Sequence, residues 1–173
     1  DGFICKGVDL VVEAFSRHPE LSVHICGPDS EEAFWDILGP KINNSSNIHY
    51  EGFVSVHSKK FEDLSSSCSF CILNTAAEGV VTSVTSLMLA GLVPIVNYQS
   101  GINVDNLKLR IKNDDDKIKS TEDAIISASK LSDRDYKDAV MKTIMESEKY
   151  SQHSFSTSFK SSVSKIMKDF LTN

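Results

Sequence analysis

Two adjoining stretches, residues 70–79 (FCILNTAAEG) and 80–96 (VVTSVTSLMLAGLVPIV), decide the fold of this chain. The first is a short apolar run that ends in a loop of small residues at Glu78-Gly79. The second begins with a helical apolar pattern, reaches a stop at Gly91, and ends in the apolar run 93–96, which is typical of a buried strand. Parallel strands need a long crossover connection, usually a helix, and the helix between these two runs supplies one. The stretch therefore predicts a strand-helix-strand unit with Glu78 at the end of its first strand.

The same alternation of helices and short apolar strands precedes this unit. In chain order, the patterns predict a helix over 8–15, a strand over 21–26, a helix over 34–38 that ends near Gly39-Pro40, a strand over 47–54, a short helix capped by Ser58, and the strand 69–73. Crossover connections of this kind build a parallel sheet covered by helices on both faces. Ligands of such sheets bind at the carboxyl ends of the strands.

The pattern changes after Gly101. A weak strand is predicted through Leu107, Leu109 and Ile111, and three helices are predicted over 120–131, 133–150 and 155–171. The last helix carries an apolar stripe whose members are Phe155, Phe159, Val163, Ile166, Met167 and Phe170. The stripe fits docking on a surface, but we expect it to pack in the core.

Composition limits the classes of function. The chain has 173 residues, 40% hydrophobic and 24% charged, which suits one globular domain. Its net charge of −6 and the absence of a basic cluster argue against nucleic-acid binding, so small molecules are the expected partners. No apolar stretch has the length of a membrane span, so we expect no transmembrane segment and a cytoplasmic location. Cys68 and Cys71 form only half of a zinc pattern, so no metal is expected.

The Glu78 loop suggests a chemistry. A strand that ends in a loop of small residues and feeds a helix points backbone N–H groups and the positive end of the helix dipole at its ligand, which suits a phosphate. An acid beside that position, such as Glu78, can accept hydrogen bonds from sugar hydroxyls. A solvated loop acid is the competing interpretation, and this loop alone does not exclude it.

Five segments extend this argument by their order and spacing. The first four are 6–15 (KGVDLVVEAF), 23–27 (VHICG), 47–54 (NIHYEGFV) and 63–73 (DLSSSCSFCIL). The fifth is 78–96, in which the matching parts are Glu78-Gly79 and 90–96 (AGLVPIV). Together they resemble the carboxy-terminal, donor-binding domain of family 4 retaining glycosyltransferases of GT-B fold. The resemblance implies an α/β, Rossmann-like doubly wound parallel sheet with extra C-terminal helices, which is one half of a GT-B fold. Residues 1–173 would then be a single nucleotide-sugar-binding domain, with the N-terminal acceptor domain absent from this chain.

The resemblance also implies roles for residues. Lys6 lies where the family places a cation on the donor diphosphate, and Glu78 lies where the family contacts hydroxyls of the donor sugar; these two are the expected catalytic residues. Backbone N–H groups at Gly79, Val80 and Val81 would meet the diphosphate. The residues expected around the nucleotide base are Phe53, Val54 and Leu64, and Gly27 and Pro28 are expected to form the turn that lets the nucleotide approach. Ordinary packing or a tight turn accounts equally well for those five.

Two positions depart from the family pattern. Ser86 stands where the family usually has a second Glu on the ribose hydroxyls, and a Ser cannot offer a bidentate carboxylate. Asp1 stands where an Arg is common. These departures support a competing hypothesis, a degenerate GT-B-like module that has lost donor binding and serves assembly. A generic doubly wound module of another class is a third hypothesis.

The expected activity is that of a glycosyltransferase of cell-surface polysaccharide or related glycan synthesis, with this fragment alone inactive. The expected partners are a nucleotide-sugar donor of UDP or GDP type and a glycan or lipid-linked acceptor reached through the missing domain. The resemblance implies neither a metal nor another cofactor, because the nucleotide-sugar is the substrate. Asp133-Arg134-Asp135, which resembles the D-x-D of metal-dependent transferases, fits better as the start of a helix.

Overall fold

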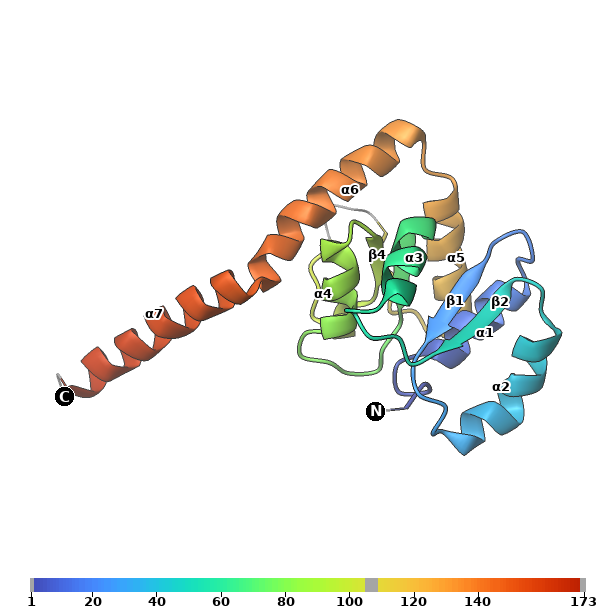
Figure 1. The fold of residues 1–173 in the computed structure, drawn as a ribbon, viewed down its shortest axis with the longest axis horizontal. Coiled ribbons are helices and arrows are strands. Elements are labelled where there is room, and N and C mark those ends of the chain that lie inside the picture. Colours follow the sequence, from blue (N-terminus) through green and yellow to red (C-terminus); the bar gives the residue numbers. More distant parts are fainter. Residues whose placement is uncertain (1, 105–108, 172–173) are drawn as a thin grey trace.

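The computed structural model describes residues 2–104 and 109–171, and in them helices and strands alternate as expected (Figure 1). The first part contains α1 (Val8–Ser16), β1 (Val23–Cys26), α2 (Glu32–Asn44), β2 (Ile48–Gly52), α3 (Lys59–Ser67), β3 (Phe70–Leu73), α4 (Thr82–Leu89) and β4 (Val93–Val96). A short 3-10 helix η1 (Tyr98–Ser100) follows, and then come α5 (Lys117–Ser129), α6 (Asp133–Ser147), η3 (Glu148–Tyr150) and α7 (Gln152–Leu171). The predicted cap of α3 is confirmed, because the Ser58 hydroxyl accepts from the N–H of Phe61.

The four described strands form two parallel pairs. Strand β1 pairs with β2, with Val23 opposite Ile48, and β3 pairs with β4, with Phe70 opposite Val93. Within each pair the carboxyl ends of the strands therefore lie at the same edge. The prediction of an α/β fold with parallel strands is confirmed, although the described hydrogen bonds make two separate pairs instead of one continuous ladder.

Two apolar clusters form the core. One packs β3 and β4 against α4, α5 and α6 and includes Met88 and Val96, both fully buried. The other packs β1 and β2 against α1 and α2, and Ile125 of α5 joins it. Ile72 of β3 is half-buried and packs against both clusters. Helix α5 and strand β3 thus connect the two halves into one packed body.

Helix α2 is longer than predicted. Gly39-Pro40 was expected to end it, but the helix continues through Pro40 to Asn44. A proline inside a helix removes one hydrogen bond and strains the preceding turn. Here Ile42, only 3% exposed, packs in the core one turn after Leu38, and that burial outweighs the loss.

The weak strand predicted through Leu107, Leu109 and Ile111 is not assigned in the described residues. Leu107 lies outside them. Leu109 and Ile111 are buried, and the Ile111 N–H donates to the Val96 carbonyl at 3.0 Å, but a single bond makes no ladder. The apolar pattern therefore predicted the burial of Leu109 and Ile111 correctly, and no strand is assigned at residues 109–111.

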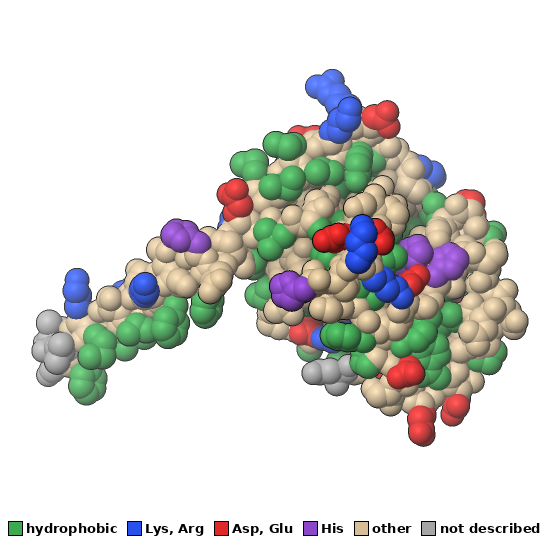
Figure 2. Space-filling model, viewed as in Figure 1, with side chains coloured by type: hydrophobic (Ala, Val, Ile, Leu, Met, Phe, Trp, Pro, Cys, Tyr) green, Lys and Arg blue, Asp and Glu red, His purple; other side chains and the backbone are tan. Residues whose placement is uncertain are grey.

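The expectation that the stripe on α7 packs in the core is wrong. Helix α7 projects from the body of the molecule (Figure 1), and its hydrophobic side chains form a row along one side (Figure 2). The members of the stripe are between 41% and 80% exposed, with Val163 at the lower limit and Phe170 at the upper. The helical period was predicted correctly, because period depends on the sequence alone, whereas burial depends on what lies opposite. Among the described helices, none has the length and apolarity needed to span a membrane.

Candidate functional site

The carboxyl ends of the strands present the predicted site residues. Strand β3 leads into the loop that carries Glu78, while β1 leads to Gly27 and β2 leads to Phe53. Lys6 comes from a different part of the chain, the turn that precedes α1. The structure nevertheless brings Lys6 and Glu78 together as an ion pair in which both side chains are mostly buried.

The turn before α1 is fixed against the end of β3. Gly7 has φ of +69°, and a Cβ at this position would lie 1.9 Å from the carbonyl oxygen of Asn74, so only glycine fits. The N–H of Ala76 donates to the Cys5 carbonyl at 2.9 Å, and the Thr75 hydroxyl donates to the same oxygen at 3.2 Å. These contacts hold the backbone on both sides of Lys6, so the ammonium reaches Glu78 from an anchored position.

The Glu78 loop is held from its other side by η1 and the residue after it. The N–H of Glu78 donates to the Gln99 carbonyl at 3.0 Å. Gly101 has φ of +69°, and a Cβ there would lie 1.7 Å from the carbonyl oxygen of Gly79. The loop is therefore seated between the Lys6 turn and the segment that follows β4.

The N-terminus of α4 lies next to Glu78 and carries free hydrogen-bonding capacity. Its cap residue Val81 makes no side-chain cap, and the first turn holds no acid. Backbone N–H groups and the dipole end are therefore available to an anion. Gly79 is exposed, as is the Val80 side chain, while the Val81 side chain is 4% exposed and belongs to the core. Of Val81, only the backbone can contribute to a site.

Ser86 lies further along α4 and is half-buried. Its hydroxyl donates to the Thr82 carbonyl at 2.9 Å, one turn earlier in the same helix. The proton is thus used within the helix, and what Ser86 can offer a ligand is its oxygen as an acceptor.

The five residues expected around the base and at the turn that admits the nucleotide have mixed environments. Gly27 donates its N–H to the Gly52 carbonyl at 3.0 Å, and a Cβ there would lie 2.5 Å from the Phe3 ring. Pro28 is exposed, and Phe53 is 79% exposed, so core packing does not explain Phe53. Val54 and Leu64 are half-buried, but Leu64 lies on α3 instead of at the end of a strand.

Asp9, in the first turn of α1, has a perturbed pKa. Burial raises the pKa of its carboxyl, more than its own and Leu10's backbone hydrogen bonds lower it, and nearby Glu31 and Glu13 raise it further. Its Oδ1 atom is buried and has no hydrogen-bond donor among the described residues. Because desolvation outweighs the backbone hydrogen bonds, the ionised Asp9 carboxylate destabilises the folded state at neutral pH.

No group of three or more His, Cys, Asp or Glu side chains that could hold a metal ion occurs in the part of the chain that the structure describes. Asp133 and Asp135 lie in the first turn of α6, where Ser132 caps the helix. The interpretation of this D-x-D as a helix start is confirmed. Cys71 is buried, which raises the pKa of its thiol to about 12, so it offers no thiolate ligand at neutral pH.

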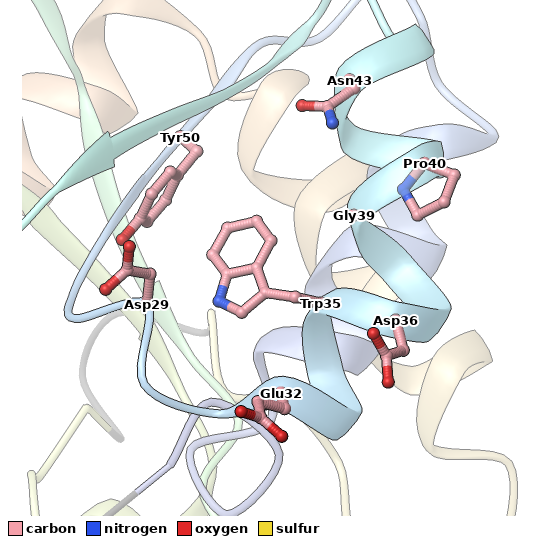
Figure 3. Close-up of a pocket in the computed structure, with 8 residues that line it drawn as sticks. All are labelled: Asp29, Glu32, Trp35, Asp36, Gly39, Pro40, Asn43 and Tyr50. Atoms are coloured by element: carbon pink, nitrogen blue, oxygen red, sulfur yellow. The ribbon is translucent and has the colours of Figure 1, made fainter.

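A cavity of about 630 Å³ lies beside α2 and β2, outside the predicted site. The Trp35 indole lies between α2 and Tyr50, with the two ring centroids 4.5 Å apart (Figure 3). Asp29, Glu32 and Asp36 supply carboxylates to the lining. None of the predicted site residues lines this cavity, and its carboxylates would repel a diphosphate. Its size therefore does not make it the better candidate for a nucleotide.

Three residues at the site were missed in the sequence. Asn74 and Asn97 each follow an apolar strand directly, and both are buried, with 6% exposure. Gln99 supplies the carbonyl that holds Glu78. The available signal was the repeated pattern of a four-residue apolar strand followed at once by Asn, because a polar residue at a strand end of a parallel sheet lies near the ligand edge.

Searches of the sequence against protein-family models and against curated proteins find no match. Solved structures do match by their fold. One is WaaG, a glycosyltransferase involved in lipopolysaccharide biosynthesis, with a TM-score of 0.62 and 16% identity over 87% of this chain and 40% of that one. Another is the GtfA/B complex, with a TM-score of 0.71 and 18% identity over 94% of this chain and 34% of that one. The fold is thus that of one half of a GT-B glycosyltransferase, and the chain spans well under half the length of either match.

Proposed function

We propose that this chain is the donor-binding domain of a retaining glycosyltransferase that acts on a cell-surface polysaccharide or related glycan. The observation that carries the proposal is the meeting of Lys6 and Glu78 beside the uncapped N-terminus of α4. A cation, an acid and free backbone N–H groups at one point suit the diphosphate and the sugar of a nucleotide-sugar. In the proposal Lys6 and the N–H groups from Gly79 to Val81 bind the diphosphate.

The remaining roles follow the edge of the strands. Glu78 accepts hydrogen bonds from the sugar hydroxyls, and the oxygen of Ser86 accepts one from the ribose. The base lies against the residues that follow β1 and β2, with Phe53 as its exposed apolar neighbour. The residues proposed around the base are Phe53, Val54 and Leu64, and Gly27 and Pro28 form the turn that lets the nucleotide approach.

The ion pair makes a specific demand on donor binding. Without a ligand the Lys6 ammonium is already neutralised by Glu78, so an incoming diphosphate must draw the ammonium away from the carboxylate. The sugar hydroxyls then replace the ammonium as partners of Glu78. Sugar and diphosphate together therefore satisfy both side chains, whereas a nucleoside diphosphate without its sugar leaves Glu78 beside a second anion.

The experiment is calorimetric titration of the protein with UDP, GDP, ADP and their sugar conjugates. One nucleotide-sugar is expected to bind more tightly than its own nucleoside diphosphate. Lys6→Ala should weaken both by about tenfold or more, the loss of a charge-assisted hydrogen bond. Glu78→Ala should abolish only the gain that the sugar gives.

Lys41→Ala provides the matched control. Lys41 pairs with Glu13 at 2.5 Å between α2 and α1, with exposure similar to that of the Lys6 pair, but away from the strand ends. This variant should leave every affinity unchanged. Equal losses in Lys6→Ala and Lys41→Ala would show a general effect of charge and would contradict the assignment of Lys6.

Ser86 supports a second candidate function, a GT-B-like module without donor binding that serves assembly. Its hydroxyl proton is used inside α4, so the ribose contact is weaker than a carboxylate would give. The same titration separates the two functions. If no nucleotide or conjugate binds to the wild-type protein, the assembly module is favoured.

A further inference from the structure

Asn97 connects the two segments that carry Lys6 and Glu78. It is 6% exposed and lies directly after β4. Its amide group donates to the side-chain oxygen of Asn74 at 2.8 Å and to the backbone carbonyl of Thr75 at 2.7 Å. One side chain thus uses both of its donors on the segment that follows β3.

The connection continues toward Lys6. Thr75, whose carbonyl accepts from Asn97, donates its hydroxyl to the Cys5 carbonyl, next to Lys6. Asn74 donates to the Thr121 hydroxyl of α5 at 2.9 Å, which fixes its amide orientation. The Asn74 backbone is also the surface on which Gly7 rests. The Lys6 turn is therefore seated on residues that Asn97 holds.

The connection toward Glu78 runs through the backbone of Asn97 itself. The Ser100 hydroxyl donates to the Asn97 carbonyl at 2.7 Å and closes the turn of η1. That turn presents the Gln99 carbonyl to the N–H of Glu78. Asn97 therefore fixes one support of the Glu78 loop by its backbone and the support of Lys6 by its side chain.

One atom of the Asn97 amide lacks a hydrogen-bond partner among the described residues. Its Oδ1 is buried and finds no donor in the described part of the chain, which an apolar side chain would avoid. Both donors, by contrast, are used on Asn74 and Thr75, the residues against which the Lys6 turn packs. We propose that Asn97 is a positioning residue that sets the distance between Lys6 and Glu78. The role in catalysis rests on the function proposed above, while the structural role does not.

The test compares Asn97→Ala with Asn47→Ala. Asn47 is also a buried Asn, 7% exposed, whose amide donates to three backbone carbonyls, but it lies directly before β2 at the opposite end of the strands. Both variants remove a buried amide of similar environment. Thr75→Val is a milder third variant that removes only the hydroxyl bond to Cys5 and nearly preserves side-chain volume.

The first readout needs no ligand. Amide exchange rates of Ala76 and Glu78, measured by NMR, report the bonds to Cys5 and Gln99. Asn97→Ala should raise the rate of Ala76 by about tenfold relative to Asn47→Ala, the effect of losing about one hydrogen bond, and should change the rate of Glu78 less, because alanine keeps the backbone carbonyl that binds Ser100. Thr75→Val should raise the rate of Ala76 alone. Equal Ala76 rates in Asn97→Ala and Asn47→Ala would overturn the positioning role, and so would an unaltered Ala76 in Thr75→Val.

The second readout uses the nucleotide-sugar identified by titration and its nucleoside diphosphate. Asn97→Ala should lose the affinity gained from the sugar, as Glu78→Ala does, whereas Asn47→Ala should keep it. If Asn97→Ala keeps that gain, Asn97 does not position the site for the donor. If the wild-type protein binds no donor at all, the proposed function fails, and the exchange rates still decide whether Asn97 fixes the two segments.

Discussion

Replacing Gly101 with alanine probes the seat of the Glu78 loop. Residue 101 has φ of +69°, where an alanine costs about 1–2 kcal/mol. The new Cβ would start 1.7 Å from the Gly79 carbonyl oxygen, and real Cβ atoms essentially never come within 3.0 Å of such a neighbour. The two segments must separate, which breaks the bond from the Glu78 N–H to the Gln99 carbonyl and costs about 1 kcal/mol more. We expect a total loss of about 2–3 kcal/mol in the free energy of unfolding.

Gly52→Ala is the matched control. Gly52 has nearly the same dihedral, φ of +71°, but a Cβ there meets nothing within 4 Å. In Gly52→Ala the free energy of unfolding should fall only by the backbone cost of the left-handed alanine, about 1–2 kcal/mol. The assay is urea unfolding followed by fluorescence of Trp35, with the midpoint read at unchanged slope. Equal losses in the two variants would refute the close contact between Gly101 and the Gly79 carbonyl.

Three further predictions concern pH and thiol chemistry. Burial raises the pKa of Asp9 in the folded state, so the contribution of its protonated carboxyl to stability is full below the unfolded pKa near 3.8 and is lost as pH rises through the folded pKa. Asp9→Asn should therefore raise the urea midpoint at pH 7. The difference in midpoint between the variant and the wild-type protein should shrink toward pH 4. Hydrogen bonds to Glu122 and Glu20 raise the pKa of His18, so its contribution is full below about pH 6.5 and is lost as pH rises through the folded value. His18→Gln should therefore flatten the pH dependence of the urea midpoint above pH 6.5. In native protein at pH 8, iodoacetamide should label the exposed Cys5, while the buried Cys71, with a pKa of about 12, should react only after denaturation, as peptide mass spectrometry would show.

The helices and strands could be predicted because their causes are local. The apolar run of β3, the apolar pattern of α4 and the capping Ser58 each act within a few residues. The prediction that α2 ends near Pro40 was wrong, because the burial of Ile42, a tertiary effect, outweighs the local tendency of proline to end a helix. The prediction that the α7 stripe packs in the core was also wrong, because periodicity shows which side chains share a face of the helix but not whether another element covers that face.

The candidate site was only partly accessible to sequence reasoning. The position of Glu78 at a strand end follows from the pattern, and the resemblance implied that Lys6 and Glu78 both belong to the donor site. Their ion pair joins distant segments and was not predicted. The support from Asn97 was not predicted, because an Asn after a strand is also typical of an ordinary loop. Hydrogen bonds between strand ends depend on register and on side-chain orientation, and neither can be determined from a single sequence.

The projecting helix has a thermodynamic consequence for measurements on this chain. Six large apolar side chains of α7 remain in water, and burying each would release about 1.5–3 kcal/mol, so together they represent roughly the whole unfolding free energy of an ordinary domain. A helix without such packing is marginal in water. Helical ellipticity should therefore begin to fall on warming while Trp35 still reports an intact core. Helical ellipticity and Trp35 fluorescence should therefore report two separate transitions, and only the fluorescence transition measures the stability of the sheet that carries the site.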